Sequence, residues 1–74
     1  MNNKRRKNVR EKVDEINRLA DELEELLEEE REAFDNTPEN LQMSDRALGM
    51  ESTIETMENA IGFIRDGIEE LEVL

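Results

Sequence analysis

The sequence predicts an all-α protein, an antiparallel two-helix hairpin that assembles into a homo-oligomeric helical bundle. Apolar residues recur in alternating steps of three and four along two long segments, which is the spacing of a coiled-coil contact line. A polar segment holding the only proline separates the two. With 74 residues the chain is one domain at most. So small a domain buries little surface, and partner chains are the expected source of further stability.

The first helix is predicted over residues 8–34. Its contact line is interrupted once, at Glu30. We expect Glu30 either to reach water or bond Arg46, or to be a polar group that holds a ligand or fixes the register. Further apolar residues at seven-residue spacing widen the stripe on one side. The contact line is Val9, Val13, Ile16, Ala20, Leu23, Leu27, Glu30 and Phe34, and the widening residues are Leu19, Leu26 and Ala33.

Residues 1–7 are predicted to form a basic N-terminal arm outside this helix. The chain carries a net charge of −11, but its cations gather near the start. Cations at the beginning of a helix oppose the helix dipole, so we expect this segment to be frayed or kept for a partner. The arm is either a solubilising tail or a phosphate-binding segment. In the second case its contacts are Lys4, Arg5, Arg6 and Lys7.

The loop over residues 35–43 is longer and richer in amide and hydroxyl groups than a hairpin turn requires. Asn36 is expected to end the first helix in a left-handed conformation. Thr37 followed by Pro38 predicts an N-cap and a short helical turn that runs to Gln42.

The second helix is predicted over residues 44–73, with Ser44 as its N-cap. Folding at the loop pairs residues of the two helices whose residue numbers sum to about 81, such as Val13 with Ile68. Its contact line is Ala47, Met50, Ile54, Met57, Ile61, Ile64, Ile68 and Leu71.

A second line on this helix contains no charge and mostly small residues. Glycine inside a helix costs about 1 kcal/mol relative to alanine, so its glycines need a compensating contact. We interpret the line as a contact between protomers, and the alternative is a neutral surface with one stray phenylalanine. The predicted oligomer interface is Leu19, Leu26, Gly49, Thr53, Thr56, Ala60, Phe63 and Gly67.

Composition argues against several functional classes. The chain has no Cys and no His, so thiolate metal sites, disulfides and the commonest general base are missing. We expect no enzyme activity, no metal site and no cofactor. The acidic helices repel phosphates, which argues against duplex nucleic acid as a partner. No segment is apolar enough for a signal peptide or membrane span, so we expect a cytoplasmic protein.

The basic arm and the loop lie at opposite ends of one hairpin, but an antiparallel dimer would bring the arm of one chain to the loop of another. Such a pocket offers cations for phosphate, amides for base edges and an aromatic face, which suits a nucleotide. The predicted ligand-binding residues are Lys4, Arg5, Arg6, Lys7, Phe34, Asn36, Thr37, Asn40, Gln42, Ser44 and Arg46.

Residues 32–46, EAFDNTPENLQMSDR, carry a resemblance. This run is similar to the loop of small acidic helical proteins from phages and prophages of gut anaerobes, which follow the order A-F-D-N-x-P-E-N-L-Q-x-S-[DE]-R. Those proteins often continue with Gly-Glu, where this chain has Ala47-Leu48. The resemblance covers nearly the whole chain and implies a phage origin. Phages encode small helical homo-oligomers that sequester cyclic-nucleotide immune signals, which this chain resembles in size and architecture.

The first functional hypothesis is therefore a non-enzymatic phage protein that sequesters a small anionic ligand, with a nucleotide immune signal as the leading candidate. The second hypothesis is an acidic helical adaptor for a host or phage protein. The third is a purely structural bundle.

Overall fold

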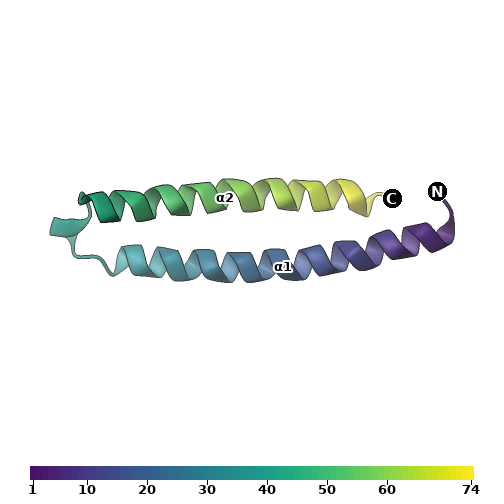
Figure 1. Ribbon diagram of the computed structural model, residues 1–74, viewed down its shortest axis with the longest axis horizontal. Coiled ribbons are helices and arrows are strands. Elements are labelled where there is room, and N and C mark those ends of the chain that lie inside the picture. Colours follow the sequence, from purple (N-terminus) through teal and green to yellow (C-terminus); the bar gives the residue numbers. More distant parts are fainter.

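The computed structural model covers residues 1–74 and contains α1 (Asn3–Asp35), the short 3-10 helix η1 (Glu39–Leu41) and α2 (Asp45–Glu72). The two long helices run antiparallel side by side, with both termini at one end and η1 at the other (Figure 1). The molecule is 59 Å long and only 15 by 13 Å across. The prediction of an all-helical hairpin without strands is confirmed.

The first helix begins five residues earlier than predicted. Asn2 caps it: the Asn2 backbone is extended, and its side-chain oxygen accepts the backbone N–H of Arg5 at 2.8 Å. The predicted boundary of a separate arm at residues 1–7 is wrong, because Lys4 to Lys7 lie in the first turns of α1. A polar N-cap stabilises a helix by about 0.5–2 kcal/mol, which offsets the weaker cost of cations near the positive end of the dipole.

The chain leaves α1 without a left-handed residue. Asn36 has φ −81° and ψ −5°, so the predicted left-handed terminator is wrong. Thr37 does not cap η1. Its hydroxyl donates to the carbonyl of Ala33 at 3.1 Å, and its N–H bonds the carbonyl of Phe34. Pro38, with φ −55° and ψ 142°, then directs the chain into η1, which lies within the predicted turn.

The start of α2 agrees with the prediction. Ser44 is the N-cap, and its hydroxyl oxygen accepts the N–H of Ala47 at 3.2 Å. Asp45 follows in the first turn, where an acid interacts favourably with the helix dipole. The helix ends at Glu72, one residue before the predicted end.

The core is a single line of buried residues. Val13, Ala20 and Ile68 form its main cluster, and Val9 and Ile64 pack against them. This cluster confirms the predicted pairing of Val13 with Ile68. The buried residues repeat mostly every seven positions, as Val13, Ala20 and Leu27 on α1 and as Ala47, Ile61 and Ile68 on α2. No helix combines the length and the apolar content needed to cross a membrane.

Candidate functional site

The buried line divides the hairpin surface into two flanks. Each residue of an α-helix is rotated by about 100° around the helix axis relative to the one before it. The residue four positions after a core residue therefore lies about 40° from it on one side of the axis, and the residue one position before it lies about 100° away on the other side. We define the ion-pair flank by the first kind of position: Asn17, Glu24, Arg31, Glu58 and Arg65. We define the small-residue flank by the second kind: Leu19, Leu26 and Ala33 on α1, and Arg46, Thr53, Ala60 and Gly67 on α2.

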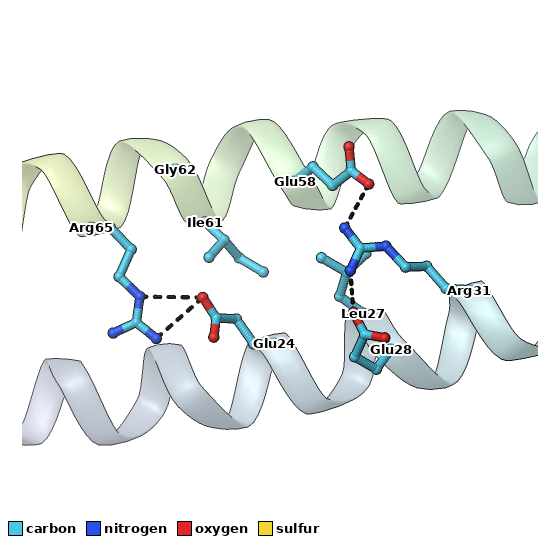
Figure 2. A pocket seen from close by; sticks show the side chains of 8 residues that line it. All are labelled: Glu24, Leu27, Glu28, Arg31, Glu58, Ile61, Gly62 and Arg65. Atoms are coloured by element: carbon cyan, nitrogen blue, oxygen red, sulfur yellow. Dashed lines mark hydrogen bonds and ion pairs between the residues drawn. The ribbon is translucent and has the colours of Figure 1, made fainter.

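Arg65 connects the two helices across the ion-pair flank. Its Nη2 lies 2.6 Å from Asp21 Oδ1, and its Nη1 donates to Asn17 Oδ1 at 3.2 Å. Its Nε donates to Glu24 Oε1 at 3.3 Å, and this contact is drawn in Figure 2. One side chain of α2 therefore holds three side chains of α1 along two helical turns.

Arg31 makes the reverse connection from α1. Its Nη2 donates to Glu58 Oε1 on α2 at 2.7 Å, and its Nη1 pairs with Glu28 on its own helix (Figure 2). The hydrogen bond to Glu58 raises the pKa of Arg31, and the hydrogen bond to Asp21 raises the pKa of Arg65. The carboxylate partners therefore favour the charged form of both guanidinium groups.

A groove of about 510 Å³ lies between the two arginines. Gly62 forms part of its wall, and a Cβ at Gly62 would meet nothing within 4 Å. Both guanidinium groups of the groove are already bonded to carboxylates, so it offers no free cation to an anionic ligand. No group of three acidic residues is placed to hold a metal ion. The groove is therefore a connection between helices and a poor ligand site.

All ion pairs between α1 and α2 involve Arg31 or Arg65. Because these pairs fix which sides of the helices face each other, both rows of the small-residue flank share the opposite side of the hairpin. Leu19 and Leu26 remain 50% and 53% exposed there. Phe63, which shares a helix face with Ala60 and Gly67, is 76% exposed.

A cavity of about 340 Å³ lies at the loop end of this same flank, which contributes Ala33 and Arg46 to it. We call it the loop cavity. Four predicted ligand residues meet there, namely Asn36, Thr37, Ser44 and Arg46. The remaining lining residues, which sequence reasoning did not assign to a site, are Ala33, Pro38, Leu41, Ala47 and Met50.

Arg46 is the charged group of the loop cavity. It forms no ion pair, so the bond to Arg46, which was one of the alternatives predicted for Glu30, is absent. All other cations from Lys12 onward pair with a carboxylate, namely Lys12, Arg18, Arg31 and Arg65. The backbone N–H groups of Asp45 and Arg46 have no backbone partner, as is usual in a first helical turn. The cavity therefore combines an unpaired guanidinium with polar side chains and an apolar wall.

The other predicted ligand residues are not among those lining the cavity. Gln42 holds the loop together, because its Nε2 donates to the carbonyl of Thr37 at 3.2 Å. Asn40 is exposed on η1, and Phe34 is half-buried near the end of α1. Lys4 to Lys7 lie at the opposite end of the hairpin, so one chain does not bring its basic residues to its own loop (Figure 1).

The predicted interface residues all lie on the surface of the hairpin. Gly49 and Gly67 have open space where a Cβ would stand, so the folded chain itself gives no packing reason for glycine there. Thr53, between them, donates its hydroxyl to the carbonyl of Gly49 at 3.0 Å.

Sequence reasoning missed Arg31 and Arg65. Their signal was present, because each lies four positions after a member of the contact line and repeats the spacing of Glu24 and Glu58. Comparison with protein-family models, with curated proteins and with solved structures finds no match to this chain.

Proposed function

We propose that this chain is a non-enzymatic, phage-type helical bundle that assembles with copies of itself and sequesters a small anionic ligand. The proposed ligand class is a nucleotide that serves as an immune signal, which would make the protein a counter-defence sponge. The observation that carries the proposal is the loop cavity with its unpaired Arg46.

Arg46 is the only cation of the loop end that has no carboxylate partner, and the other unpaired cations all lie within the first ten residues. Arginine suits phosphate because its planar group donates two parallel hydrogen bonds to neighbouring oxygens. Asn36 adds an amide that suits the edge of a base, and Leu41 and Met50 supply apolar contact. The volume of about 340 Å³ falls in the range of small-molecule sites.

Self-assembly is the second part of the proposal. The hairpin leaves Leu19, Leu26 and Phe63 largely exposed, while its own core is one residue wide. Burying such side chains against another copy is the usual way in which a small helical unit gains stability. An assembly also gives the loop cavity neighbours that one hairpin does not have.

Calorimetry of the purified chain against AMP, ATP, cyclic AMP and cyclic di-AMP tests ligand binding, at low and at moderate salt because ionic strength weakens phosphate contacts. We expect Arg46→Ala to abolish binding. Arg18→Ala is the matched control, since Arg18 is exposed and pairs only with Glu22 of its own helix. Absence of binding to all four compounds would refute the ligand proposal.

The exposed acids favour one second candidate, an acidic adaptor that binds a host or phage protein. Only a few of the 21 acidic residues pair with a cation, so the rest form a broad negative surface. Such a surface attracts basic partners at long range. A stoichiometric protein that co-purifies with the wild type, combined with no nucleotide binding, would favour this candidate.

A further inference from the structure

We infer that the small-residue flank is the surface on which a second copy of this chain docks end for end, so that the first turns of the partner close the loop cavity. The docking is argued from the surface residues of the hairpin alone. The closure of the loop cavity around a ligand rests on the proposed function. The experiments below therefore test the docking and the ligand separately.

The two flanks differ in what they can offer to a partner. The ion-pair flank carries carboxylates that are already bonded, and burying them under another chain would cost their desolvation. The small-residue flank exposes Leu19 and Leu26 beside Ala60 and Gly67, where small side chains allow another helix to approach closely. The hairpin is 59 Å long, so a second copy that lies along this flank can contact it over many helical turns.

Charge selects the direction of docking. The α1 row of the flank continues by the same seven-residue step from Leu19 back to Lys12 and Arg5. Same-end docking would place these cations beside their own copies. End-for-end docking places them instead near the loop end of the other chain, where residues 32–46 carry four acids, Glu32, Asp35, Glu39 and Asp45, against the single cation Arg46. Pairing opposite charges favours the second arrangement, and repulsion between like charges opposes the first.

The spacing along the flank fits the same arrangement. Lys12 comes seven residues before Leu19. Ala33, which lines the loop cavity, comes seven residues after Leu26. If the second copy is rotated end for end about the midpoint of Leu19 and Leu26, Lys12 of each chain therefore comes to the same height along the helix axis as Ala33 of the other chain. Arg5, a further seven residues away, reaches the level of the loop.

The docked copy thus supplies the cations that the loop cavity lacks. Alone, the cavity has one charged group, the guanidinium of Arg46, among polar and apolar residues. Arg5 forms no ion pair, and Lys12 has only an exposed 3.5 Å contact with Glu15 of its own helix. Both are therefore available for a phosphate in the other chain. Two equivalent cavities arise per dimer, each completed by the first turns of the opposite chain.

Distances between spin labels test the docking without any ligand. The chain has no cysteine, so Glu11→Cys and Glu25→Cys each give one label, on the outward row of α1. With 1.5 Å of rise per residue, end-for-end docking offsets the two labels along the axis by about 35 Å at position 11 and about 8 Å at position 25. We therefore expect a long distance between the labels at position 11 and a short distance between the labels at position 25. Equal short distances at both positions, or no distance between copies, would overturn the inference.

Paired double variants test the closure of the cavity. With cyclic di-AMP as the probe, Arg5→Ala with Lys12→Ala should weaken binding at least tenfold. Arg10→Ala with Arg18→Ala removes the same charge from outside the small-residue flank and should change affinity less than twofold. Equal losses in both would overturn closure by the partner.

The two proposals fail in different ways. End-for-end label distances without nucleotide binding would refute the proposed function and leave the interface. Nucleotide binding with same-end distances would refute the docking and leave the proposed function.

Discussion

Two neighbouring leucines allow the folding of the hairpin to be separated from its assembly. Leu27 is 5% exposed in the core line, whereas Leu26 is 53% exposed on the small-residue flank. Leu27→Ala should destabilise the hairpin by roughly 2–5 kcal/mol, as expected for a buried leucine replaced in a core. Leu26→Ala should leave the isolated hairpin almost unchanged and should act on assembly.

The size of the assembly effect follows from the exposed fraction. Fully burying a leucine side chain is worth about 1.5–3 kcal/mol. Leu26 retains about half of its surface for a partner, so each copy can still gain about 1 kcal/mol. A symmetric dimer contains the residue twice. Leu26→Ala should therefore raise the dimer dissociation constant roughly ten- to hundredfold, at about 1.4 kcal/mol per factor of ten.

Sedimentation equilibrium measures the dissociation constant, and urea unfolding at two protein concentrations measures stability. For Leu26→Ala we expect a weaker dimer and unfolding that loses part of its dependence on concentration. For Leu27→Ala we expect lower stability at both concentrations. If Leu26→Ala leaves the dissociation constant unchanged, or if the wild type sediments as a monomer at micromolar concentration, the assignment of this flank is refuted.

Three further changes test the local structure. Arg65→Gln should lower the thermal midpoint more than Arg18→Gln. Because bonded carboxylates raise the pKa of Arg65 in the folded state, its contribution is present below its usual strongly basic range and should stay constant from about pH 6 to pH 10. Asn2→Ala should fray the first turns of α1, measured as faster amide exchange at Arg5 and Arg6, because it removes a cap worth about 0.5–2 kcal/mol. Ser44→Ala should cost a similar amount in urea unfolding, since Ser44 caps α2.

The helices and their register could be predicted because a contact line repeats within each segment and needs no knowledge of distant residues. Val13 and Ile68 meet as predicted for this reason. The predicted start of α1 was wrong because it was based on the unfavourable interaction of Lys4 to Lys7 with the helix dipole. The side chain of Asn2 caps the helix and determines where it begins. The errors in the helices concern their ends, since Asn2 caps α1 earlier than predicted and Asn36 ends it without a left-handed conformation.

The candidate site was predictable only in part. Composition identified the loop as unusually polar, and Ser44 and Arg46 do line a cavity there. Which residues face that cavity depends on the path of the chain through Pro38 and η1, and no periodic pattern describes that path. Gln42 illustrates this, because its amide is used to hold Thr37 rather than to line the cavity.

The polar contacts between the two acidic helices are confined to one flank of the hairpin. Two acidic helices side by side repel each other, and Arg65 and Arg31 counter that repulsion with cross-helix ion pairs on one flank. The opposite flank contributes no such pair. Its two leucines, Gly67 and the unpaired Arg46 are consequently free for contacts outside the hairpin. If polar bridges were spread over both flanks, docking another copy would first have to break them.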